Sequence, residues 1–128
     1  MSLILPAIGE QTCIGFMLGV TVPGNQLLHL YINNVAPTSA STLASFTEMS
    51  TLGYAALTLT KTSWVVSAQT GHSQAAYANQ TWTFTAGTAV SAYGYYITDA
   101  TTGALLWQKH LVGRLLCQTQ ATPSKLRL

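Results

Sequence analysis

Residues 92–110, AYGYYITDATTGALLWQKH, decide the fold that this sequence predicts. Two runs of mainly apolar and aromatic residues, 92–98 and 104–110, flank the short segment 99–103. The Asp that opens this segment can bond its own backbone, and the Gly that closes it accepts a left-handed conformation. The stretch therefore predicts a β-hairpin with two antiparallel strands.

Strand patterns continue on the N-terminal side of this hairpin. Residues 80–86 alternate most cleanly, with Trp82 and Phe84 on one side and threonines on the other. Residues 26–32 alternate between two sets of mainly apolar side chains, which predicts a strand with both faces partly covered. Shorter strands are expected within 54–60 and at 64–66, and polar or small-residue loops at 33–53 and 67–79.

The N-terminal segment has a different pattern. Residues 8–19 place their apolar side chains loosely along one side of a short helix, and Pro6 argues against an earlier start. Residues 22–25, Val-Pro-Gly-Asn, are typical of a turn. After Leu111 the alternation is lost, which predicts either a last irregular strand or an extended tail that reaches a neighbour.

Together these patterns predict the fold class. Five or six short strands with no repeating βα unit favour a mainly β fold: an antiparallel β-sandwich or barrel-like sheet with a short N-terminal helix and extended arms. A length of 128 residues fits one domain with one core. We expect an N-terminal arm and short helix at 1–24, a β core at 26–111 and a C-terminal tail at 112–128.

The composition indicates assembly. Charged residues make up 6% of the chain and apolar residues 48%, whereas about a quarter of a typical chain is charged. Interspersed charges usually keep a free domain monomeric, so their scarcity suggests that much of the surface is covered in the working state. Most of the cations stand near the C-terminus, without interleaved aromatic residues or a Gly-rich phosphate loop, and we expect no nucleic-acid binding. These cations are Lys109, Arg114, Lys125 and Arg127.

No catalytic, cofactor-binding or metal site is predicted. The three carboxylates, Glu10, Glu48 and Asp99, fall in a helix, a loop and a hairpin turn, where Glu10 suits a helix start and Asp99 suits a turn. No Ser stands in a Gly-x-Ser-x-Gly elbow. The histidines are scattered, and His29 is expected to be packed or at an interface. The other two are His72, in a loop, and His110, at a strand edge.

Cysteine and aromatic residues add no specific site. Cys13 and Cys117 lie near opposite ends of the chain without CxxC spacing, so we expect buried thiols and leave a disulfide open. The aromatic residues could serve as stacking platforms for sugars or bases, but their alternating placement favours a core role. They are Trp82, Phe84, Tyr93, Tyr95, Tyr96 and Trp107.

Neither secretion nor membrane insertion is expected. Residues 1–9 have no cationic region, and the apolar stretch 13–22 is shorter than the roughly 20 residues that cross a bilayer. We expect the chain to be made in the cytoplasm of its host.

An ordered series of segments resembles a family of small structural proteins of tailed bacteriophage virions. The segments are LPAIGE at 5–10, HLYINNVAP at 29–37, FTEM at 46–49, GYAALTL at 53–59, QTWTFT at 80–85, YGYYITD at 93–99 and GALLW at 103–107. They cover most of 5–111 in order. Members of this family tend to continue with a Gly-Asp-containing turn and another alternating strand, whereas residues 113–128 here are basic and irregular.

The resemblance implies a capsid cement or decoration protein on the outside of the head. Such a protein would bridge neighbouring major capsid proteins as a homo-oligomer, with a trimer as one closed arrangement. The N-terminal arm and the loops at 33–53 and 67–79 are the expected contact regions. A tail or fibre-associated structural protein is the alternative within the same class. A carbohydrate-binding module at a fibre and a small hydrolase are rival classes, and the hydrolase would need carboxylates and histidines within hydrogen-bond reach.

Overall fold

The computed structural model describes residues 3–117 and 124–126. In this part of the chain the fold is mainly β, with one N-terminal α-helix and antiparallel sheets, which confirms the predicted fold class. The elements are α1 (Ala7–Met17), β1 (Gln26–Tyr31), η1 (Leu43–Ser45), β2 (Leu57–Leu59), η2 (Lys61–Ser63), β3 (Val65–Gln69), β4 (His72–Ala76), β5 (Gln80–Trp82), β6 (Val90–Asp99), β7 (Leu105–Cys117) and β8 (Ser124–Leu126). The two η elements are short 3-10 turns.

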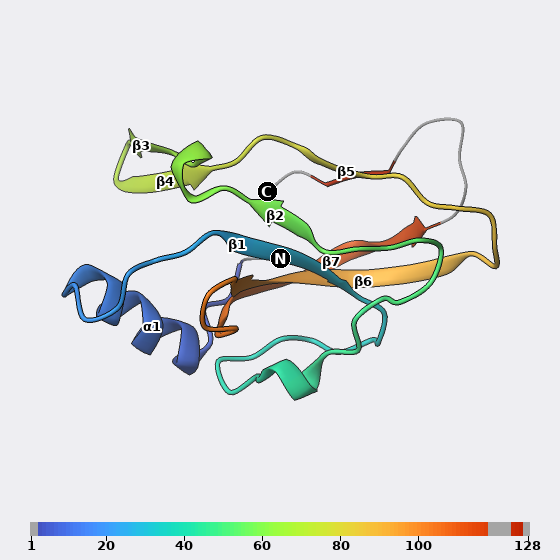
Figure 1. The fold of residues 1–128 in the computed structure, drawn as a ribbon, viewed down its shortest axis with the longest axis horizontal. Coiled ribbons are helices and arrows are strands. Elements are labelled where there is room, and N and C mark those ends of the chain that lie inside the picture. The colour runs from blue at the N-terminus through green and yellow to red at the C-terminus, as the bar shows by residue number, and fades with distance from the viewer. Residues whose placement is uncertain (1–2, 118–123, 127–128) are drawn as a thin grey trace.

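A four-stranded antiparallel sheet with the order β2-β1-β6-β7 forms the centre of the fold. β3 pairs with β4, and β5 pairs with β8, in two further two-stranded sheets. Figure 1 shows β3, β4 and β5 above the central sheet, the segment around η1 below it and α1 at one end. Both faces of the central sheet are therefore covered, as in a sandwich.

The hairpin predicted at 92–110 is present as β6 and β7. Its turn depends on Asp99, whose Oδ2 accepts hydrogen bonds from the backbone nitrogens of Thr101 at 3.1 Å and Thr102 at 2.8 Å, and from the Thr102 hydroxyl at 2.9 Å. Gly103 closes the turn with a φ of 74°. The expected role of Asp99 as a turn residue is confirmed.

The strands predicted at 26–32 and 80–86 are present in shorter form. β1 buries Leu28 and Leu30 on one face and Tyr31 on the other, which confirms that both faces are covered. β5 ends at Trp82, but Trp82 and Phe84 are buried while the alternating Thr81, Thr83 and Thr85 are exposed. The alternation predicted for this segment is therefore confirmed beyond the strand itself.

The prediction of a loop at 67–79 was wrong, because most of this segment belongs to a second hairpin. β3 runs to Gln69, a tight turn follows with Gly71 at a φ of 79°, and β4 pairs with β3 from His72 to Ala76. The residues of β4 are small or polar and mostly exposed, so they have no alternation of apolar and polar side chains. Backbone hydrogen bonds form this ladder, and they need no such pattern.

The C-terminal segment also contains more strand than the boundary at 111 implies. β7 continues to Cys117, where its backbone pairs with Val90 of β6, so the alternative of a last irregular strand is confirmed for 112–117. Register shifts interrupt the β6–β7 ladder, which explains why its side chains lose strict alternation. β8, further along the expected tail, pairs with β5. Residues 118–123 and 127–128 lie outside the described residues.

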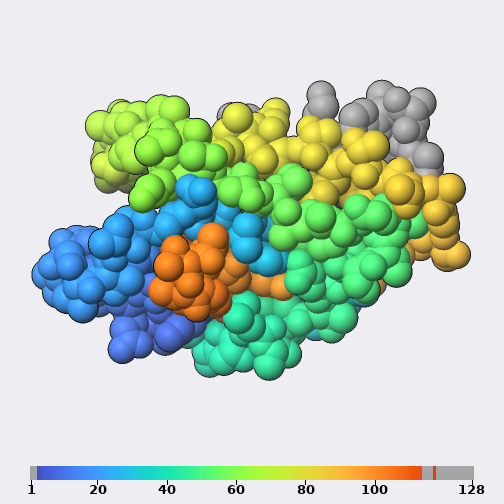
Figure 2. Space-filling view, viewed as in Figure 1, coloured from blue at the N-terminus to red at the C-terminus, as the bar shows by residue number. Residues whose placement is uncertain are grey.

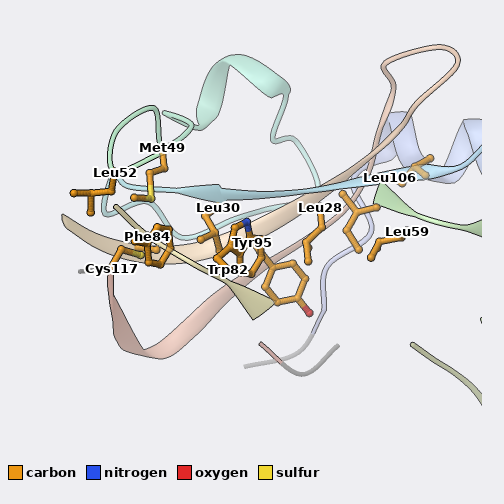
Figure 3. Packing of buried hydrophobic residues seen from close by; sticks show 12 residues of the cluster. Leu28, Leu30, Met49, Leu52, Leu59, Trp82, Phe84, Tyr95, Leu106 and Cys117 are labelled. Atoms are coloured by element: carbon orange, nitrogen blue, oxygen red, sulfur yellow. The ribbon is translucent and has the colours of Figure 1, made fainter. Parts of the chain in front are cut away.

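The core has one part on each face of the central sheet. The larger part lies between this sheet and the layer that contains β5, and Figure 3 shows its side chains spread along the length of the sheet. The smaller part joins Tyr31, Phe46, Tyr96 and Leu105, with Phe46 stacked on Tyr96 at 5.1 Å between ring centroids. The predicted core role of the aromatic residues is confirmed for four of them, which are Trp82, Phe84, Tyr95 and Tyr96.

The helix α1 packs through its backbone at Gly9 and through Phe16, which is partly buried against the larger part of the core. Gly9 is its only buried residue, and a Cβ atom there would lie 2.3 Å from the carbonyl oxygen of Leu106 on β7. Glu10 lies in the first turn, as expected for a helix-start carboxylate. Cys13 lies on the helix and Cys117 in the core, and no disulfide joins them.

Candidate functional sites

A hydrogen-bonded polar cluster lies on the face of the central sheet that carries Tyr96. His29 Nδ1 lies 2.7 Å from Glu48 Oε1, and His29 Nε2 lies 2.9 Å from the Thr98 hydroxyl. The imidazole of His29 also stacks on the Tyr96 ring, with 4.6 Å between centroids and 8° between planes. Because an ionised carboxylate only accepts, Nδ1 donates to Glu48, and the Nε2 of a neutral imidazole accepts from Thr98.

Two tyrosines complete this cluster. The Tyr54 hydroxyl donates to Glu48 Oε1 at 3.0 Å and accepts from the backbone nitrogen of Leu30 at 2.9 Å. Burial raises the pKa of Tyr54, and burial followed by the charge of Glu48 raises the pKa of Tyr96. Both phenols therefore stay protonated at neutral pH and act as hydrogen-bond donors.

The order Thr98–His29–Glu48 is the order of nucleophile, base and orienting acid in a catalytic triad. However, the residue in the position of the nucleophile is buried, and the residue in the position of the orienting acid is exposed. The hydroxyl that would attack belongs to a residue that is only 6% exposed, whereas the side chain of the orienting Glu48 is 40% exposed. A nucleophile needs a space beside it for a substrate, and neither of the two cavities described below is lined by these three residues.

We therefore interpret the cluster as a structural connection between β1, β6 and the segment before Met49. The prediction that His29 is packed is confirmed. The sequence had no signal for its pairing with Glu48, because the two residues are 19 positions apart and meet through an isolated bridge between Tyr31 and Glu48.

The other titratable residues singled out in the sequence are not brought together. His72 is exposed, as expected, but it begins strand β4 and does not lie in the predicted loop; its ring nitrogen is 3.2 Å from the Thr70 carbonyl oxygen. His110 is half-buried beside the Tyr31 ring. Among the residues that the structure describes, no group of three or more His, Cys, Asp or Glu could hold a metal ion. The side chains of the cations after Lys109 lie outside the described part.

An apolar cavity of about 210 Å³ opens between the β3–β4 hairpin and the central sheet. Trp64 and Trp107 approach edge-on in its wall, with 6.1 Å between ring centroids. The Trp64 indole nitrogen already donates to Gln26 Oε1 at 2.7 Å, so it offers no polar contact to a ligand. The lining residues are Leu3, Trp64, Ala75, Tyr95, Ile97 and Trp107.

A second cavity, of about 450 Å³, lies between α1 and η1. Ile8 from the helix, Leu43 from η1 and Leu105 from β7 form its apolar wall. No carboxylate, imidazole, thiol or cationic side chain lines either cavity, and burial raises the pKa of the Tyr95 phenol in the first. Both are therefore suited to apolar contacts rather than to acid–base chemistry.

Exposed aliphatic side chains are concentrated at the end of α1 and in the residues that follow it. Five aliphatic side chains, defined here as the α1 apolar surface, each expose more than half of their area: Ile14, Met17, Leu18, Val20 and Val22. Figure 2 shows this N-terminal part of the chain protruding at one end of the molecule. Several strongly exposed aliphatic side chains within one short segment indicate an interaction site.

The sequence predicted that Ile14, Met17 and Leu18 lie along one side of a helix and that Val22 begins a turn, but it did not place these side chains in solvent. The composition was the available signal, since a chain with so few charges must cover its surface partly with apolar groups. A second, smaller exposed pair, Val65 and Val66, lies on β3.

Comparisons with models of protein families, with curated proteins and with solved structures find no match for this chain. The resemblance to small virion proteins thus stays a prediction. No helix among the described residues has the length and apolar character to cross a membrane.

Proposed function

We propose that this protein is a bacteriophage virion structural protein, acting as a capsid cement or decoration protein on the outside of the head. The observation that carries the proposal is the α1 apolar surface on a chain with only 6% charged residues. Leaving such side chains in water is unfavourable, and an assembled subunit covers them. The ordered segments between 5 and 111 that resemble small virion proteins support the phage setting.

The mechanism is the addition of buried area across the joints between major capsid proteins. Each Å² of apolar surface removed from water contributes about 25 cal/mol, so many copies add up small contacts. A protein that binds only the assembled shell stabilises it by mass action against the pressure of packaged DNA. The partners are the major capsid protein and further copies of this chain. We propose no cofactor, and no binding to membrane or nucleic acid.

The location of the protein in the particle tests this proposal. Antibody labelling and image reconstruction of intact virions should place the chain on the head surface. Heads from which it has been removed should release DNA at a lower temperature than complete heads. If antibody labelled the tail alone, the cementing role would be rejected in favour of the alternative, a tail or fibre-associated structural protein. Absence of the chain from purified particles would overturn both.

A carbohydrate-binding module at a fibre is the second candidate, and the cavity beside Trp107 favours it. Trp82 is buried, but Trp107 is only partly buried and could stack on a sugar. Sugar recognition also needs several convergent polar groups, and the Trp64 nitrogen in this wall is already bound to Gln26. We rank this function second. A glycan array with the native protein and Trp107→Ala tests it, since only specific binding would depend on the indole.

We propose that the protein is not an enzyme. His29 and Glu48 meet the hydrogen-bond distance that a hydrolase would need, but Thr98 is buried. Purified protein should hydrolyse activated esters no faster than its Thr98→Val variant. A rate that falls at least tenfold in the variant, with the fold intact by circular dichroism, would reverse this proposal.

A further inference from the structure

We infer that the α1 apolar surface binds the same surface of a second copy of this chain, across a two-fold axis. The inference deepens the proposed function and rests on it for its biological setting. It also changes the expected contact region, because the sequence indicated the N-terminal arm and the loops at 33–53 and 67–79.

The chemistry of the surface favours a second copy as its partner. From 11 to 22 the chain has no charged residue, and the nearest charges stand at its two ends: the exposed Glu10 before it, and Lys61, whose ammonium donates to the Pro23 carbonyl oxygen at 3.1 Å. An aliphatic surface is best covered by a second aliphatic surface, and another copy of this chain carries such a surface. Two-fold dimers, in which the same patch faces itself, are the most common closed oligomers.

The shape of the surface agrees with self-association. Ile14, Met17 and Leu18 follow the i, i+3, i+4 spacing that forms a ridge on a helix. A helix end that protrudes from the molecule (Figures 1 and 2) is convex and does not enclose an inserted peptide. Two such ridges can pack into each other's grooves, with the central sheets pointing away from the contact.

The surface is also held in place before binding. The backbone nitrogens of Val20 and Thr21 both donate to the Gly15 carbonyl oxygen, at 2.9 and 3.2 Å, which folds the chain after α1 back onto the helix. At the other end, the Ala7 nitrogen donates to the Ser39 carbonyl oxygen at 2.9 Å. A preorganised surface loses less conformational entropy on binding than a mobile one.

The exposed area predicts a weak dimer. A buried aliphatic side chain removes about 60–120 Å² of apolar area from water, so the five side chains, at their exposed fractions, offer about 200–450 Å². Homodimer interfaces are about 65% apolar, which gives a contact of about 300–700 Å² per partner. A standard stable interface buries about 800 Å² per partner, so this contact belongs with the small, weak interfaces.

Sedimentation equilibrium of the purified full chain tests the inference, over a concentration range of about 1–300 μM in which a weak dimer would form. The native mass should rise from one chain to two and then stop. Leu18→Glu should stay monomeric throughout, and Met17→Lys, at the most exposed position, provides a second variant. Val66→Glu is the matched control: Val66 is 74% exposed and Leu18 73%, but Val66 lies on β3. It should dimerise like the native protein.

Each outcome decides the question, provided that circular dichroism and melting show the variants folded. A native protein that stays monomeric overturns the inference, as does loss of the dimer in Val66→Glu alone. Masses that grow beyond two chains would indicate head-to-tail contacts and overturn the two-fold arrangement. The proposed function fails separately: a dimer that is absent from virions refutes only the virion role, and a monomer found on the head surface refutes only this inference.

Discussion

Replacing Asp99 with Ala should destabilise the whole fold, although the residue lies in a hairpin turn. Asp99 is fully buried, and its two carboxylate oxygens accept four hydrogen bonds. Three come from Thr101 and Thr102 within the turn, and the fourth comes from the backbone nitrogen of Gly24 at 3.1 Å, just before β1. The side chain thus ties the turn of the central hairpin to the start of the neighbouring strand.

The magnitude follows from the environment of the four donors. A hydrogen bond to a charged group contributes about 1.5–3 kcal/mol, and a buried donor left without a partner costs about 1–3 kcal/mol. Thr101 and Thr102 are exposed, so water can replace the carboxylate for their donors, whereas Gly24 is half-buried. We therefore expect a loss of about 3–4 kcal/mol in the free energy of unfolding, well below the simple sum of four bonds.

Urea denaturation followed by tryptophan fluorescence measures this loss. With a slope of about 1.5–2 kcal/mol per molar urea, the midpoint of Asp99→Ala should fall by about 2 M with the slope unchanged. Glu10→Ala, which removes an exposed carboxylate from α1, is the matched control and should shift the midpoint by less than about 0.3 M. A loss below about 1 kcal/mol for Asp99→Ala would refute the reasoning that this carboxylate connects the turn to β1.

Three further predictions concern pH, the core and the polar cluster. Burial acts to raise the pKa of Asp99, but hydrogen bonds from Thr102, Gly24 and Thr101 outweigh it and leave the pKa lowered. This carboxylate therefore stabilises the fold fully at pH values above its ordinary pKa of 3.8, and the stabilisation is lost as the pH falls through the lowered pKa of the folded state. Urea midpoints of the native protein measured down through this pH range should show a decline that Asp99→Ala lacks. Leu30→Ala should cost about 2–5 kcal/mol in urea, whereas Val65→Ala, at an exposed position, should change stability by less than about 0.5 kcal/mol. His29→Ala should cost about 1–3 kcal/mol, because it removes the partner of the buried Thr98 hydroxyl and the stack on the Tyr96 ring; an unchanged melting temperature would contradict the structural role of the cluster.

The parts of the fold that could be predicted are those where a side-chain pattern and a local turn agree. The hairpin at 92–110 has both, since Asp99 bonds residues two and three positions ahead and Gly103 adopts a positive φ. The alternation through Trp82 and Phe84 likewise reports which side of the chain faces the core. These features depend on short-range chemistry that a sequence displays directly.

The parts that could not be predicted depend on backbone pairing or on distant partners. β4 pairs with β3 through main-chain groups that every residue carries, so its small and polar side chains gave no signal. The pairing of His29 with Glu48 requires the chain to come back beside β1 after the 19 positions that separate the two residues. Such a contact cannot be predicted from residue spacing or from composition.

By itself, the sequence determined a mainly β fold with a short N-terminal helix, and it determined that few charges are available to the surface. Only the tertiary structure decided which apolar residues remain in water. The helix period at 8–19 is the same whether its apolar side faces the core or the solvent, because periodicity describes one element and not what lies beside it. In the structure, the missing side chain of Gly9 lets the backbone of α1 rest on β7, Phe16 packs against the larger part of the core, and Met17 and Leu18 stay exposed.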